Sequence, residues 1–105
     1  MEQKRYIAIV KLKNDTDMNR LAGVISMVDE LFSRFSNGEK EHVFRSNDGL
    51  VFGFFFKSAV AGQIMRAEFE KLTTTNNEDS ILIFEAGELA CGRGFSRAWT
   101  WLQHH

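Results

Sequence analysis

The chain contains no proline and a single cysteine, Cys91, among its 105 residues. Without proline it can hold neither a proline-rich linker nor a proline-based ligand motif. One cysteine cannot form a disulfide within the chain, and the polar start at residues 1–5 does not resemble a signal peptide. We therefore expect a cytoplasmic protein.

The chain also lacks an excess of charge of either sign. Thirteen Lys and Arg residues against fourteen Asp and Glu residues give a net charge of −1. There is consequently no global field that would attract nucleic acid or an anionic membrane, and any such binding would have to be local. No apolar run approaches the roughly 20 residues that a membrane-spanning helix requires, so no membrane partner is expected.

Phenylalanine, by contrast, is abundant, with ten residues in this short chain. The densest group lies in the segment 49–57, GLVFGFFFK. On a strand, alternate side chains point to opposite faces, so Phe52, Phe54 and Phe56 share one face while Val51 and Phe55 share the other. Both faces are apolar, and the second therefore needs a cover: a segment of the same chain, a second subunit or a ligand.

The length of 105 residues predicts a single domain, residues 1–105, and hydrophobic periodicity and turn signals predict its elements. Thr16 is the expected N-cap of a first helix and Ser58 that of a second, whose apolar stripe includes Ile64. The segment 95–102 fits either a short helix or a strand, because its apolar residues satisfy both spacings. In chain order, the predicted elements are a strand at 6–10, a helix from 16 to 37, a hairpin of strands at 41–45 and 49–57, a helix from 58 to 72 and a strand at 81–84.

The order β-α-β-β-α-β resembles the ferredoxin-like split βαβ arrangement, an α+β fold. This resemblance implies one antiparallel four-stranded sheet in the order 4-1-3-2, with both helices on one face and a C-terminal extension at 95–105. The polar segment 41–45 suits an edge strand, and the apolar strands suit the centre. With Ile7 and Ile9 facing the helices, the open face would carry Tyr6, Ala8, Val10, Phe52, Phe54 and Phe56.

This surplus of apolar surface favours a small non-catalytic module for protein interaction or regulation, homodimeric through its open face. An uncovered patch of aromatic side chains would be an aggregation hazard, so a partner or a lid is expected there. Trp99 and Trp101 are the first candidates for such a lid or for contacts with a protein partner. The predicted interface residues are Tyr6, Phe52, Phe54, Phe56, Trp99 and Trp101.

An alternative partner, single-stranded nucleic acid, follows from a short motif. Phe52-Gly53-Phe54-Phe55 matches the middle of the third-strand signature of the RNA-recognition motif, and Tyr6-Ile7 matches a pair in its first-strand signature. The segment resembles that family, which implies aromatic side chains that stack on bases. Where that signature begins with a basic residue, this chain has Leu50-Val51 instead. The local basic rim would comprise Arg5, Lys57, Arg93 and Arg97.

A second alternative is a small cofactor-free enzyme of the dimeric ferredoxin-like type, by analogy of fold alone. His42 and Glu85 are the candidate catalytic pair, since an enzyme needs titratable groups aimed into a pocket. No cofactor is implied. No metal site is expected either, because the adjacent His104 and His105 lack the spacing of metal ligands. The charged residues of the first helix, Arg20, Asp29, Glu30 and Arg34, are interpreted as a solvated surface.

Overall fold

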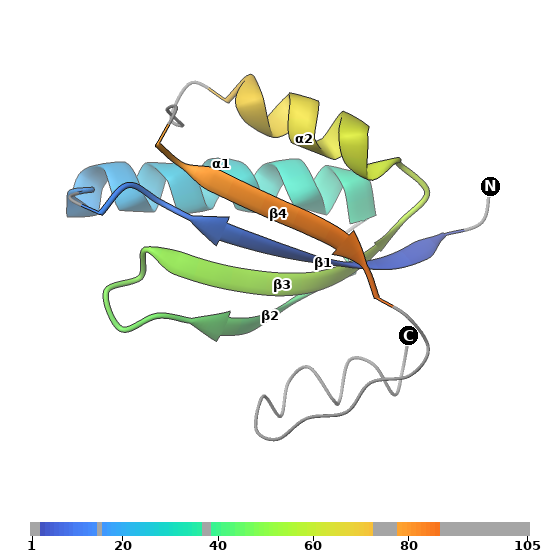
Figure 1. The fold of residues 1–105 in the computed structure, drawn as a ribbon, viewed down its shortest axis with the longest axis horizontal. Helices are drawn as coiled ribbons and strands as arrows, with labels where there is room; N and C mark the ends of the chain where they lie inside the picture. Colours follow the sequence, from blue (N-terminus) through green and yellow to red (C-terminus); the bar gives the residue numbers. More distant parts are fainter. Residues whose placement is uncertain (1–2, 15, 37–38, 73–77, 87–105) are drawn as a thin grey trace.

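The structure is a computed structural model that describes residues 3–14, 16–36, 39–72 and 78–86. Four antiparallel strands form one sheet in the order β2-β3-β1-β4, and two helices cover one of its faces (Figure 1). Read from the opposite edge, this is the predicted order 4-1-3-2, so the predicted α+β fold is confirmed. The elements are β1 (Lys4–Lys11), α1 (Met18–Ser36), β2 (Lys40–Arg45), β3 (Val51–Ser58), α2 (Gly62–Glu70) and β4 (Ser80–Glu85).

The start of α1 differs from the prediction by one residue. Asp17, not Thr16, is the N-cap, because its carboxylate accepts a hydrogen bond from the backbone amide of Arg20 at 2.8 Å. The Thr16 hydroxyl instead donates to the carbonyl of Lys13 at 2.6 Å. One face of α1 packs on the sheet and buries Leu21, Val24, Val28, Leu31 and Phe32.

The start of α2 also differs from the prediction. Ser58 does not cap this helix, because it is the buried last residue of β3 and its hydroxyl accepts the amide of Val60 at 3.0 Å. Ala61 occupies the N-cap position and supplies no side-chain hydrogen bond. Of the predicted stripe, Met65 is buried, but Ile64 is 55% exposed, so its assignment to the core is wrong.

The two central strands, β1 and β3, turn toward the helices the faces that were predicted to be open. Phe52, Phe54 and Phe56 are no more than 2% exposed and lie in the core beneath the helices, together with Tyr6, Ala8 and Val10. The Phe32 ring of α1 meets the rings of Phe54 and Phe56 edge-on, with centroids 5.1 and 5.3 Å apart. Each such buried ring contributes roughly 1.5–3 kcal/mol to stability.

Packing gives the reason for this choice of face. The layer between sheet and helices must be filled at high density, and the Phe52 face of β3 offers an unbroken row of large side chains. The opposite face of β3 carries Gly53 and Lys57, which would leave a gap and bury a charge if they pointed inward. Within the described ranges, no helix combines the length and apolarity needed to cross a membrane.

Candidate functional site

The face of the sheet turned away from the helices carries a second set of apolar side chains. In the register of the sheet, Ile7 lies opposite both Phe55 and Phe84, and Ile9 lies opposite both Gly53 and Leu82. These residues therefore form two rows that cross the strands, as neighbouring pairs on one face do. We define the open-face patch as Ile7, Ile9, Phe44, Phe55, Leu82 and Phe84.

Phe44 enters this patch through an irregularity in β2. The register between β2 and β3 shifts between His42 and Phe44, which places Phe44 opposite Gly53. A Cβ atom at Gly53 would lie 2.7 Å from Cζ of Phe44 and closer still to Cε1, so the ring lies directly over the glycine. Glycine at this position lets the aromatic ring rest on the backbone of β3.

Exposure within the open-face patch increases from the centre of the sheet toward β4. Phe55 is 8% exposed and packs against Ile7, Val43 and Ala86. Leu82 and Phe84 are 55% and 45% exposed, respectively. No described helix covers this face, and β4 is an edge strand with one side free of strand pairing in the described sheet. The most accessible part of the patch is thus the part next to a free sheet edge.

The predicted basic rim is only partly within the described residues. Arg5 and Lys57 lie opposite each other at one end of the open face, where β1 pairs with β3. The other predicted positions, Arg93 and Arg97, lie outside the described residues, as do Trp99 and Trp101. What the structure places together on this face is therefore an apolar patch with two cations at one end.

The predicted partner-contact residues that the structure describes are not on this face. Tyr6 is 9% exposed, and Phe52, Phe54 and Phe56 are buried beneath the helices. The predicted placement is wrong because alternation identifies which residues share a face but not which face is covered. The same correction applies to the resemblance to the RNA-recognition motif, since the Tyr6 and Phe54 rings that match it are buried in the core.

The predicted catalytic pair is also separated. His42 is on β2 and Glu85 is at the end of β4, the two opposite edges of the sheet. Three strand spacings lie between these edges, roughly 14 Å, which is too far for the two side chains to act on one proton. The structure does not bring His42 and Glu85 together.

His42 instead belongs to a charge cluster that the sequence interpretation missed. The Asp29 carboxylate of α1 pairs with the Lys40 ammonium, and its Oδ1 lies 3.2 Å from Nε2 of His42. Partial burial by itself raises the pKa of Asp29, but hydrogen bonds from Lys40 and His42 and their charges outweigh it and hold the pKa below its ordinary value. The cluster fastens α1 to the edge strand β2.

A second ion pair contradicts the interpretation of the α1 charges as purely solvated. The Asp79 side chain has no exposed surface, and it pairs with the Arg20 guanidinium, whose side chain is 24% exposed. The backbone amide of Lys13 also donates to Oδ1 of Asp79, at 3.0 Å. The start of α1, the end of β1 and the start of β4 are thereby joined at one point.

Neither cluster gathers the ligands of a metal site. Among the described residues, no group of three or more His, Cys, Asp or Glu side chains could hold a metal ion. Cys91, His104 and His105 lie outside the described residues. Comparison of the chain with models of known families, with curated proteins and with solved structures gives no match. A functional conclusion therefore depends on the geometry of the chain itself.

Proposed function

We propose that this protein is a small non-catalytic interaction module that self-associates by packing the open-face patches of two copies against each other. The observation that carries the proposal is the pair of apolar rows across the open face, of which Leu82 and Phe84 are 55% and 45% exposed. Contiguous exposed apolar side chains on a soluble domain indicate an interaction surface. A two-fold axis through the patch would let the same residues face one another.

The size of the face sets the expected strength of this association. Strands spaced about 4.8 Å apart and rising about 3.3 Å per residue give a four-stranded face on the order of 500 Å². Two such faces would bury on the order of 1,000 Å², at the low end of specific interfaces. We therefore expect a reversible dimer that dissociates on dilution, not an obligate one.

A second copy suits this patch better than single-stranded nucleic acid does. The chain has a net charge of −1, whereas nucleic-acid binding depends largely on neutralising phosphates. On the described open face, the rings that could stack on bases are those of Phe44, Phe55 and Phe84, and Phe55 is already packed against its neighbours. Apolar rows favour the burial of apolar surface over electrostatic capture.

The test is sedimentation velocity of the full chain from low to high micromolar concentration. Leu82→Lys should weaken the dimer strongly, because it places a charge within the packed face. Ile64→Lys is a matched control, since Ile64 is also 55% exposed but lies on α2, on the other side of the sheet. A monomer at every concentration, or equal weakening by both variants, would refute the proposal.

Tryptophan fluorescence identifies the other possible occupants of the patch. Both tryptophans, Trp99 and Trp101, lie beyond β4, so their emission reports on the C-terminal segment alone. A monomer whose emission shifts to the red in Leu82→Lys, but not in Ile64→Lys, would show that this segment covers the patch. Salt-sensitive quenching by an oligonucleotide that persists in Leu82→Lys would indicate nucleic-acid binding instead.

A further inference from the structure

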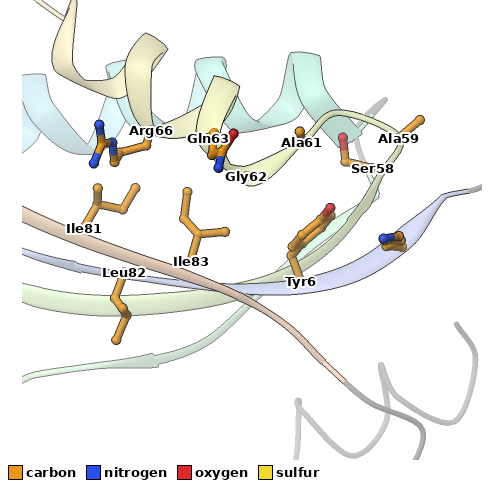
Figure 2. A pocket seen from close by; sticks show the side chains of 11 residues that line it. Tyr6, Ser58, Ala59, Ala61, Gly62, Gln63, Arg66, Ile81, Leu82 and Ile83 are labelled. Carbon is orange, nitrogen blue, oxygen red and sulfur yellow. The ribbon is translucent and has the colours of Figure 1, made fainter.

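A groove lies on the helix side of the sheet, between the start of α2 and the strands β1 and β4. It has a volume of about 1160 Å³, enough to hold a small organic molecule. Figure 2 shows the start of α2 on one side of the groove and the side chains of Ile81 and Ile83 on the other. The groove lies on the helix side of the sheet, although Leu82 of the open-face patch also contributes to its lining.

The start of α2 presents unused hydrogen-bond donors to this groove. The first hydrogen bonds of the helix run from the amides of Ile64 and Met65 to the carbonyl of Ala61. The amides of Gly62 and Gln63 donate no hydrogen bond within the described residues, and no side chain caps them. The first turn also contains no acidic residue, so the positive end of the helix dipole is not compensated there.

Tyr6 provides a second, independent indication of a ligand. Its side chain lies in the core, 9% exposed, with its ring stacked on Phe56 at a centroid distance of 5.5 Å. The hydroxyl points toward Ser58 and Ala61, where the chain enters α2 (Figure 2), and it forms no hydrogen bond within the described residues. Buried polar groups nearly always have a hydrogen-bond partner, so an unpaired hydroxyl aimed into a groove indicates a missing acceptor.

The remaining walls define the chemistry of that acceptor. Arg66, one helical turn after Gly62, and Lys4 line the same groove, and their ion pairs with Glu70 and Glu85 are long, at 3.7 and 3.9 Å. Such solvent-exposed pairs are weak, so both cations can turn toward an anion in the groove. Ile81 and Ile83 supply an apolar floor. The groove therefore combines cations that suit a negative charge with apolar side chains that suit an apolar body.

We propose that the groove binds a small organic anion, a carboxylate or phosphate group attached to an apolar body. The anionic group would accept hydrogen bonds from the amides of Gly62 and Gln63 and from the Tyr6 hydroxyl, with Arg66 as the countercharge. The apolar body would lie on Ile81 and Ile83. This inference does not depend on self-association through the open-face patch.

The test is a titration of the full chain followed by the amide resonances of Gly62 and Gln63 in NMR spectra. The probes are hexanoate, hexyl phosphate, inorganic phosphate and 1-hexanol. Hexanoate or hexyl phosphate should shift these two resonances saturably, and the stronger of the two identifies the anionic group. Inorganic phosphate and 1-hexanol should each bind at least about tenfold more weakly, because each lacks one half of the ligand. Equal binding of 1-hexanol, or shifts with inorganic phosphate alone, would overturn the proposal.

Gly62→Asp tests the helix end without disturbing the fold. A Cβ atom at Gly62 would lie 3.9 Å from Cγ2 of Ile83, an ordinary contact. The new carboxylate would compensate the helix dipole and repel the ligand, so binding should weaken by about tenfold or more while the melting temperature is unchanged or higher. Unchanged affinity of this variant would refute the site.

Tyr6→Phe tests the buried hydroxyl. The variant should lose about tenfold in affinity, since hydrogen bonds to charged groups are the stronger ones. Without ligand its melting temperature should be equal to or above that of the parent, because the hydroxyl has no internal partner to lose. Lys71→Gln is the control, as Lys71 is an exposed cation just after α2, outside the lining of the groove. A loss of affinity in this control as large as in Tyr6→Phe would refute specific binding.

Discussion

Replacing Gly53 by alanine should destabilise this protein in the parent chain and stabilise it once Phe44 is removed. The new Cβ atom would lie 2.7 Å from Cζ of Phe44 and closer still to Cε1, distances that no packed structure tolerates. The Phe44 ring must therefore leave its place over β3. Because Gly53 does not have a positive φ, alanine brings no backbone strain of its own.

Two opposing terms set the magnitude of this effect. Overpacking a well-filled site costs about 1–3 kcal/mol. Glycine within a strand costs roughly 0.5–1 kcal/mol relative to alanine, and Gly53→Ala recovers this amount. In the parent chain the clash with Phe44 outweighs the gain, so the free energy of unfolding should fall by about 0.5–2 kcal/mol. In a Phe44→Ala background the clash is absent, and the same substitution should raise it by roughly 0.5–1 kcal/mol.

Urea unfolding of the four chains, followed by circular dichroism, measures both terms in one double-mutant cycle. The expected coupling between Gly53 and Phe44 is about 1–3 kcal/mol, with the effect of Gly53→Ala changing sign between backgrounds. Independent and additive effects of the two substitutions would refute the placement of the Phe44 ring over Gly53. That result would also remove Phe44 from the open-face patch.

Three further predictions concern the core and the two charge clusters. Phe54→Ala should lower the free energy of unfolding by about 3–5 kcal/mol and leave any self-association of the folded fraction unchanged, because Phe54 lies beneath the helices; a small loss in urea unfolding would contradict that burial. Asp79→Asn should cost about 3–5 kcal/mol in the same assay, since it breaks an ion pair whose carboxylate is fully buried, and a neutral result would show that the pair adds nothing. The pKa of Asp29 is lowered in the folded protein, so its pairing with Lys40 and His42 stabilises the fold above the ordinary carboxyl pKa. This stability is lost as the pH falls through the lower pKa of the folded state. Urea midpoints measured from about pH 6 to about pH 2 should therefore fall less for Asp29→Asn than for the parent chain, and parallel curves would contradict this assignment.

Local patterns were sufficient for the order of the elements, and the resemblance of that order to the ferredoxin-like arrangement implied the sheet topology. The apolar spacing of α1 and the alternation of β1 and β3 depend only on near neighbours, and strand apolarity separated central strands from the edge. Helix starts were less accurate: Asp17 replaced Thr16 as the cap of α1, and Ala61 replaced Ser58 in α2. A cap depends on the backbone geometry of a few residues, which composition alone does not specify.

The position of the candidate site could be predicted only in part from the amino-acid sequence. On the strands with two apolar faces, one face carries Gly53 and Lys57 on β3 and Arg5 and Lys11 on β1. On β3, a charge and a glycine on one face, against an unbroken row of phenylalanine on the other, favour solvent for the first face. On β1 the other face also carries a charge, Lys4, so polarity alone did not decide which face the helices cover.

The sequence by itself determined the order of the elements and the fact that β3 is apolar on both faces, because these follow from local periodicity. The strand order came from the resemblance of that order of elements to the ferredoxin-like arrangement. Only the tertiary structure decided which apolar face lies beneath the helices, because that depends on filling the layer that α1 and α2 create. Only the tertiary structure brought Tyr6 to the start of α2 and Asp79 to Arg20, since the packing of helices on the sheet joins residues far apart in the chain. The Phe-rich strand thus supplies the core, while the candidate interaction surface is formed by the less conspicuous side chains on its reverse face.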